Sequence, residues 1–239
     1  MKTTVWNPVR GCHKISSGCK HCYIALGDQK KGRDFNHIEL TSQYDRIIRK
    51  NKKGEYVIPS NTLVYTCFSS DFFLEELDNY RHDWWAMIKE RNDLSFLCLT
   101  KRIDRIDHAL PLDFPLGYEH FTIGVSVENQ SMADYRLPFL LRSSFQHKLI
   151  VCQPLLDYIN LDAYLAGIEA VVVGGEAGKE GREMDYAWVL KIRDTCIKHR
   201  VSFSFRQTSS NFIKDGITHH IPWRMLSSMA KSFDLDVTF

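Results

Sequence analysis

The chain has 239 residues, of which 44% are hydrophobic and 25% charged, and its formal net charge at pH 7 is +2. This composition excludes an intrinsically disordered chain and a strongly basic nucleic-acid-binding protein, although it is compatible with a local basic groove. Residues 1–10 lack the apolar run of a signal peptide, and no stretch has the length of a membrane span. We therefore expect a cytoplasmic protein that makes no contact with a membrane.

Short apolar runs rich in Val, Ile, Phe and Thr recur along the chain, beginning with a short strand expected at residues 3–6. From about residue 60 onward they alternate with helix-like segments, and most of them end in polar residues or glycine. That pattern is typical of parallel strands buried on both faces. We predict further strands at residues 62–68, 94–100, 120–127, 147–153, 169–175 and 201–207.

The segments between these strands carry apolar residues at helical spacing. Asp78 is the expected N-cap of one helix, and Asp185 that of another helix reaching about His199. Residues 27–61 are polar and interrupt the alternation. We read them as an insertion with one amphipathic helix from residue 40 to about residue 50.

Repeated strand–helix alternation produces right-handed βαβ units, so the fold is α/β. The pattern fits a closed or partly open parallel β/α barrel, or a doubly wound sheet. Residues 1–239 contain no Pro/Gly-rich linker, and we expect a single domain.

Polar residues stand where the predicted strands end, and in β/α barrels the chemistry lies at that end of the strands. The C-terminal ends of parallel strands share one face, so we expect these side chains to converge with the loop that follows the first strand. They are Ser69, Ser70, Asp71, Thr100, Lys101, Arg102, Ser126, Glu128, Asn129, Gln153, Gly174, Gly175, Glu176, Arg206 and Gln207.

Three of the seven cysteines lie in one polar loop, "RGCHKISSGCKHCY", as Cys12, Cys19 and Cys22 with the spacing C-x6-C-x2-C. A [4Fe–4S] cluster normally takes four thiolates, so three would leave one iron open to a small molecule such as S-adenosylmethionine (SAM). One alternative is zinc held by the three thiols with His13 or His21, and another is three unligated thiols prone to oxidation. The spacing alone does not decide among them. The remaining cysteines lie in apolar runs and are expected to be small buried hydrophobic residues.

The stretch "WNPVRGCHKISSGCKHCY", followed by "LTKR", "GVSVENQ", "PLL" and "VVVGGEAG", resembles the phage-associated three-Cys-motif family, which is grouped with radical SAM proteins. These motifs run in order across nearly the whole chain. The resemblance implies a partial or nearly closed TIM-like β/α barrel of the radical SAM type that binds a [4Fe–4S] cluster and SAM. Two departures stand out. The first cysteine gap is six residues rather than the usual three, and a Gly-Gly-Glu triplet follows a late strand rather than the second.

Within such a barrel the strand-end residues would bind the cofactor. The residues after the 62–68 strand would contact the methionine end of SAM, and those after the 120–127 strand its ribose hydroxyls. The ordinary alternatives are an N-cap at Asp71 and a tight turn at the two glycines. The candidate cofactor-binding residues are Ser69, Ser70, Asp71, Thr100, Ser126, Glu128, Asn129, Gly174 and Gly175.

Three charged residues are candidate catalytic residues. Lys101 would supply a cation to the SAM carboxylate or to a substrate phosphate; alternatively, Lys101 and Arg102 are two solvated residues that open the next helix with Asp104. Glu176 would bind substrate or SAM, and Arg206 would contact an anionic substrate.

The leading hypothesis is a radical SAM enzyme that cleaves SAM to a 5′-deoxyadenosyl radical, with an electron from a flavodoxin- or ferredoxin-like donor. A nucleotide or nucleic acid is the first substrate we expect, because of the phage association and the basic stretch "RIIRKNKK" at residues 46–53. A solvated helix face is the ordinary alternative for that stretch. The second hypothesis is a non-catalytic module, in which zinc on the same cysteines holds together an α/β domain that binds nucleic acid or a protein partner.

Overall fold

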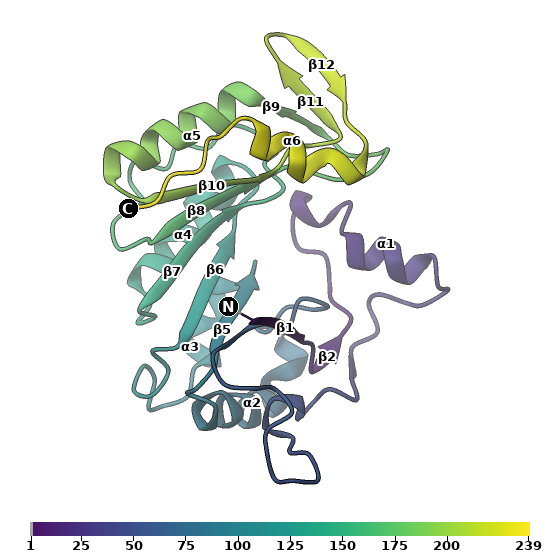
Figure 1. Cartoon of the computed structure of the whole chain (residues 1–239), viewed down its shortest axis with the longest axis vertical. Helices are drawn as coiled ribbons and strands as arrows, with labels where there is room; N and C mark the ends of the chain where they lie inside the picture. The colour runs from purple at the N-terminus through teal and green to yellow at the C-terminus, as the bar shows by residue number, and fades with distance from the viewer. Residues whose placement is uncertain (1) are drawn as a thin grey trace. The chain divides into compact units, whose positions relative to one another are not determined.

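The computed structural model describes residues 2–239, and within them seven parallel strands form one sheet in the order β1-β4-β5-β6-β7-β8-β10 (Figure 1). This topology is consistent with a partial TIM-like barrel and confirms the α/β fold class. Every predicted strand is present, with its ends within two residues of those expected. The strands are β1 (Lys2–Trp6), β4 (Thr62–Thr66), β5 (Ser95–Thr100), β6 (Phe121–Ser126), β7 (His147–Cys152), β8 (Ala170–Gly174) and β10 (Ser202–Gln207).

Helices and two small sheets complete the described chain. The α-helices are α1 (Tyr23–Gln29), α2 (Asp78–Glu90), α3 (Ile106–Ala109), α4 (Gln130–Arg142), α5 (Tyr186–His199) and α6 (Leu226–Ser232). One small sheet pairs β2 (Val9–Arg10) with β3 (Glu39–Leu40), and the other has the order β12 (Ile217–His220), β11 (Asn211–Lys214), β9 (Glu183–Asp185). Short 3-10 helices are η1 (Ser17–Cys19), η2 (Arg46–Ile48), η3 (Glu75–Leu77), η4 (Ile103–Arg105) and η5 (Trp223–Met225).

The chain divides into two compact units. The first comprises residues 2–15, 22–124 and 143–147, and the second comprises residues 16–21, 125–142 and 148–239. The prediction of a single domain over residues 1–239 stays a prediction.

The core of the first unit is aromatic. Trp6, at the end of β1, is fully buried and meets Trp84 of α2 edge-on, with ring centroids 6.4 Å apart. The Trp85 ring lies 5.1 Å from Phe72 and 4.9 Å from Phe121 of β6. Because such rings bury large apolar areas, these contacts fix α2 against the strands of its unit.

The core of the second unit joins β10 to the small sheet and the C-terminal helix. The Phe212 ring of β11 lies 6.3 Å from Phe205 of β10 and 5.8 Å from Phe233. Phe233 in turn lies 4.7 Å from Tyr186 of α5. The C-terminal segment, for which the sequence suggests no role, completes this core through Phe233.

The predicted amphipathic helix over residues 40–50 is wrong. That stretch consists of the end of β3, turns and the 3-10 helix η2. Side chains distant in sequence take carbonyl groups that a helix would need for its own amides: the Trp6 indole donates to the Gln43 carbonyl at 2.9 Å, and the Arg91 guanidinium to the Ile47 carbonyl. Tertiary hydrogen bonds thus replace the helical ones.

The two predicted helix caps have different outcomes. Asp185 caps α5 as expected, since its Oδ1 accepts from the Ala187 amide at 2.8 Å. The N-cap of α2 is Leu77, and Asp78 is instead the first helical residue. The capping role is lost because η3 runs directly into α2, and the Asp78 carboxylate pairs with Arg105 at 2.8 Å.

A buried arginine, Arg91, follows α2 in the first unit and binds groups from three other parts of the chain. Arg91 is fully buried and donates to the Ile58 carbonyl at 2.8 Å and to Asp93 Oδ1 at 2.8 Å, and its guanidinium lies 3.9 Å from the centre of the Tyr56 ring. The hydrogen bonds from Arg91, opposed by burial, lower the pKa of Asp93 from 3.8 to about 2.

This depressed pKa predicts a defined acid dependence of stability. The Asp93 carboxylate stabilises the fold above its unfolded-state pKa, and the stabilisation is lost as the pH falls towards about 2. We expect Asp93→Asn to lower the free energy of unfolding by about 2 kcal/mol at neutral pH and to flatten its pH dependence between about pH 4 and 2. Urea denaturation at a series of pH values measures both. An unchanged acid slope in the variant would contradict the assignment.

No helix within residues 2–239 combines the length and the apolar character needed to cross a bilayer.

Candidate functional site

Two serines after β4 hold the segment that leads to the first motif cysteine. Ser69 Oγ donates to the Val9 carbonyl at 2.8 Å, and its amide donates to Asn7 Oδ1 at 3.2 Å. The Ser70 hydroxyl donates to the Gly11 carbonyl. Both hydroxyls, expected to contact SAM, are therefore bonded to the backbone of the chain itself.

Gly11 makes a close backbone approach that only glycine permits. Its φ is +89°, and a Cβ atom there would lie 2.1 Å from the His37 carbonyl oxygen. The Cys12 amide donates to the Phe35 carbonyl at 2.9 Å. Residues 35–37 thus fix the backbone on either side of the Gly11–Cys12 bond.

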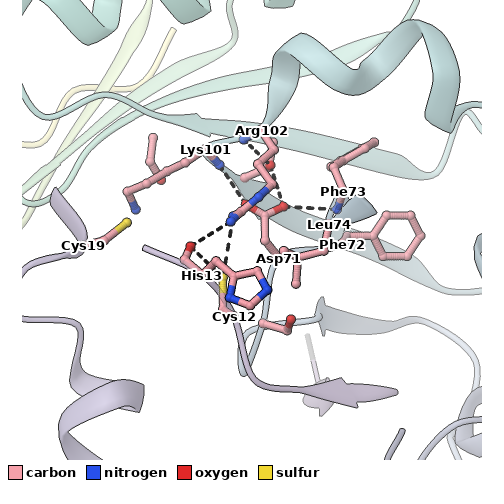
Figure 2. Close-up of polar contacts among 12 residues, drawn as sticks. Cys12, His13, Cys19, Asp71, Phe72, Phe73, Leu74, Lys101 and Arg102 are labelled. Atoms are coloured by element: carbon pink, nitrogen blue, oxygen red, sulfur yellow. Dashed lines mark hydrogen bonds and ion pairs between the residues drawn. The ribbon is translucent and has the colours of Figure 1, made fainter. Parts of the chain in front are cut away.

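Asp71 is the centre of a buried polar network, shown in Figure 2. Its Oδ1 accepts from Thr100 Oγ1 at 2.7 Å and from the Phe73 amide at 3.1 Å. Its Oδ2 accepts from the Lys101 amide at 3.1 Å and from Arg102 Nη1 at 3.2 Å. Asp71 and Thr100 thereby orient the arginine that follows β5.

Arg102 points from this network to the cysteine segment (Figure 2). Its Nη1 lies 3.6 Å from Cys12 Sγ, and its Nη2 donates to the His13 carbonyl at 2.7 Å. Burial would lower the pKa of the guanidinium, but Asp71 and Cys12 outweigh that effect and raise it. A cation beside a thiol favours the thiolate form. Arg102 is 8% exposed, and Lys101 is half-buried. The alternative that residues 101–102 are both solvated is therefore wrong for Arg102.

In the second unit, Glu128 holds residues 16–18. Its Oε1 accepts from the Gly18 amide at 3.1 Å, and its Oε2 pairs with Arg136 Nη1 at 2.8 Å. Burial would raise the pKa of Glu128, but the Ser16 hydroxyl, the charge of Arg136 and the Gly18 amide lower it below its usual range. The buried carboxylate is therefore charged, and each oxygen has a partner within the protein.

Glu176 makes a similar set of contacts with residues 17–21. His21 Nδ1 lies 3.1 Å from Glu176 Oε2, and the same oxygen accepts from Arg182 Nε at 2.9 Å and from the Arg182 amide at 3.0 Å. Arg182 Nη2 donates to the Ser17 carbonyl at 2.9 Å. Burial would raise the pKa of Glu176, yet the bonds from Arg182 and His21 lower it.

The remaining strand-end residues have ordinary local roles. Ser126 is buried and its carbonyl accepts from Arg136 at 2.8 Å, and Asn129 Oδ1 accepts from the Met132 amide at 3.0 Å at the start of α4. Arg206 is exposed at an irregularity of β10.

The two glycines after β8 are sites of close packing. A Cβ at Gly174 would lie 2.7 Å from Gln153 Cδ, and one at Gly175 would lie 2.3 Å from the Ser209 amide nitrogen. Neither position tolerates a side chain without rearrangement of its neighbour, so these glycines are explained by close packing within the chain and not by the tight turn offered as an alternative.

The seven cysteines fall into two classes. Cys67, Cys98, Cys152 and Cys196 are buried, which confirms their expected role as small hydrophobic residues. Burial raises the pKa of each of these thiols above its ordinary value, in the case of Cys196 to about 12.

The three motif cysteines are half-exposed; Cys12 and Cys22 belong to the first unit and Cys19 to the second. Within residues 2–239, the structure presents no group of three His, Cys, Asp or Glu side chains arranged to hold a metal ion. The chemistry of the motif nonetheless fits an iron–sulfur cluster, because accessible cysteine thiols are the ligands that such clusters take. That the three thiols share one ligand stays a prediction.

A pocket of about 760 Å³ lies within the first unit beside the cysteine segment. Its lining includes the basic side chains of His13, Lys14 and Arg33 and the apolar side chains of Leu26 and Phe35. Such a mixture suits a ligand with an anionic group and an apolar face.

Sequence reasoning missed the arginines that hold the carboxylates. Arg136 lies on the buried face of α4 with Ala133, Leu137 and Leu140, and a charged residue at an apolar helical position was the available signal. Arg182 follows a glycine-rich segment and carried no comparable signal.

A family model described as "Protein of unknown function (DUF5131)" matches residues 2–230. That description names no activity, cofactor or source. No curated protein and no solved structure matches the chain.

Proposed function

The chain belongs to DUF5131, a family of proteins of unknown function, and we propose that it is a radical SAM enzyme that binds a [4Fe–4S] cluster through Cys12, Cys19 and Cys22. The observation that carries the proposal is the contrast among its cysteines. These three are half-exposed and lie within eleven residues of one another, whereas the other four are buried. The partial parallel barrel and the resemblance to the phage-associated three-Cys-motif family support it.

When bound, a [4Fe–4S] cluster with one open iron supplies the electron that cleaves SAM to a 5′-deoxyadenosyl radical. The three thiolates would hold the cluster. Arg102, 3.6 Å from Cys12 Sγ, would stabilise the first thiolate, and Asp71 would keep that guanidinium in place. We further propose a flavodoxin- or ferredoxin-like electron donor and a cytoplasmic location.

A nucleotide or nucleic acid is the proposed substrate class. The pocket beside His13 supports it, because Lys14 and Arg33 suit phosphate oxygens and Phe35 suits the face of a base. The basic residues 46–53 would add a long-range attraction for a polyanion.

Electron paramagnetic resonance tests the proposal. We expect anaerobically purified, dithionite-reduced protein to give a [4Fe–4S]+ signal that changes shape when SAM is added. Cys12→Ala, Cys19→Ala and Cys22→Ala should each abolish the signal, whereas Cys196→Ala, which removes a buried thiol, should retain it. A signal indifferent to SAM would contradict SAM binding. Zinc in place of iron in the same preparation would favour a non-catalytic module.

A further inference from the structure

The segment that carries Cys19, residues 16–21, is held by side chains at both ends, and we call it the Cys19 loop. On its N-terminal side, the Gly18 amide donates to Glu128 and the Ser17 carbonyl accepts from Arg182, at 3.1 and 2.9 Å. Both bonds hold the same peptide group, the one between Ser17 and Gly18, which lies one residue before the cysteine. The backbone that carries the Cys19 side chain is therefore positioned by residues far along the chain, Glu128 and Arg182.

On the C-terminal side the loop is held through a side chain. His21 Nδ1 lies 3.1 Å from Glu176 Oε2, and the same carboxylate is bonded to Arg182. Arg182 thus acts at both ends of the loop, directly on Ser17 and through Glu176 on His21.

The fit between the loop and Glu128 is close. A Cβ atom at Gly18 would lie 2.9 Å from Glu128 Cδ and 3.2 Å from both carboxylate oxygens. Glu128 is fully buried, and Arg136, 2% exposed, neutralises it. Both oxygens of Glu128 are thus committed to groups of the protein rather than to the ribose of a cofactor.

From these contacts we propose that Glu128 and Glu176, each fixed by an arginine, are positioning residues that hold the Cys19 loop in its ligand-binding conformation. A ligand held by thiolates needs its donors preorganised, and a glycine-containing loop does not supply that order by itself. The identity of that ligand rests on the proposed function, whereas the contacts that hold the loop do not depend on it.

The test measures the reactivity of Cys19 in the metal-free full-length protein. The variant is Arg182→Met, and the matched control is Arg193→Met. Arg193 lies in the same unit, its side chain is equally exposed at 27%, and it also donates to a backbone carbonyl, that of Leu235. Alkylation by N-ethylmaleimide is followed at each cysteine by peptide mass spectrometry.

We expect Arg182→Met to raise the alkylation rate of Cys19 roughly tenfold, as loss of a charge-assisted hydrogen bond would allow. Cys12, in the other unit, serves as the internal reference and should change less than about twofold. Arg193→Met should leave both rates unchanged, and Arg182→Lys should restore part of the protection. An equal rate at Cys19 in Arg182→Met and the unmodified protein would overturn the proposal. So would an equal increase at every cysteine, since that would indicate general destabilisation.

Gly18→Ala supplies a second variant that leaves every charge in place. Its added methyl group should displace the loop from Glu128 and raise Cys19 alkylation, while the Glu128–Arg136 pair stays intact. Iron content after reconstitution separates the two proposals. Iron uptake by the unmodified protein that falls in Arg182→Met but not in Arg193→Met supports both. A protein that takes up no iron, yet shows the alkylation difference, refutes the proposed function and retains the positioning role.

Discussion

Replacing Arg136 by methionine is expected to lower the free energy of unfolding by about 3–5 kcal/mol. The Arg136 side chain is 2% exposed, and its guanidinium pairs with Glu128 at 2.8 Å and donates to the Ser126 carbonyl at 2.8 Å. Methionine fills a similar volume but leaves Glu128 as a buried charge without its partner. The cost therefore comes from the remaining carboxylate rather than from a cavity.

Chemical denaturation and thermal unfolding measure this effect, and the melting temperature should fall by roughly 6–20 °C. Arg142→Met, which alters an exposed arginine of the same helix, is the control and should cost less than about 1 kcal/mol. The double variant Glu128→Gln/Arg136→Met removes the uncompensated charge, so it should be more stable than Arg136→Met alone. A double variant as unstable as the sum of both single changes would refute the charge argument.

Replacing Asp71 by asparagine is expected to have the second largest effect, about 3 kcal/mol of stability together with release of the Cys12 segment. The buried carboxylate accepts four hydrogen bonds, including those from Thr100 and Arg102. An asparagine amide has only one acceptor oxygen, so its NH2 group must face donors. Arg102 then loses the charge that holds it beside Cys12.

Two measurements separate these consequences. Denaturation reports the stability loss, and cysteine-resolved alkylation of the metal-free protein should show faster reaction at Cys12 and little change at the buried Cys98. Asp83→Asn is the matched control, because Asp83 is an exposed carboxylate of the same unit that accepts from Tyr44 at 2.8 Å. We expect it to change stability by less than about 1 kcal/mol. If Asp71→Asn behaves like this control, the network around Asp71 does not position Cys12.

Several of the polar residues at the strand ends hold a segment that carries a motif cysteine. After β4 and β5, Ser70, Asp71 and Arg102 hold the Gly11–His13 backbone. After β6 and β8, Glu128 and Glu176 hold the Cys19 loop. Ser69, Ser70 and Glu128, three of the residues selected from the sequence as cofactor contacts, are thus bonded to the segments that carry the cysteines. These strand-end residues would then act on a cofactor indirectly, by positioning the segments that carry its cysteine ligands.

The strands could be predicted because their signal is local. Each is a short apolar run with a polar end, and that local pattern is enough to predict a strand. The same reasoning failed at residues 40–50, where the amphipathic pattern was real but Trp6 and Arg91 took backbone carbonyls of the segment. Those donors lie 37 and 44 positions away, outside any window over which periodicity can be read.

The sequence by itself determined the α/β class, the strands, the outlying loop of three cysteines and the burial of the other four. Each follows from residue type and spacing over fewer than about twenty positions. Only the tertiary structure decided what the charged strand-end residues contact. Gly18 and Glu128 are 110 positions apart, and Ser17 and Arg182 are 165 apart. A buried charge must find a partner wherever the fold brings one, so its role is fixed by packing and not by its neighbours in the chain.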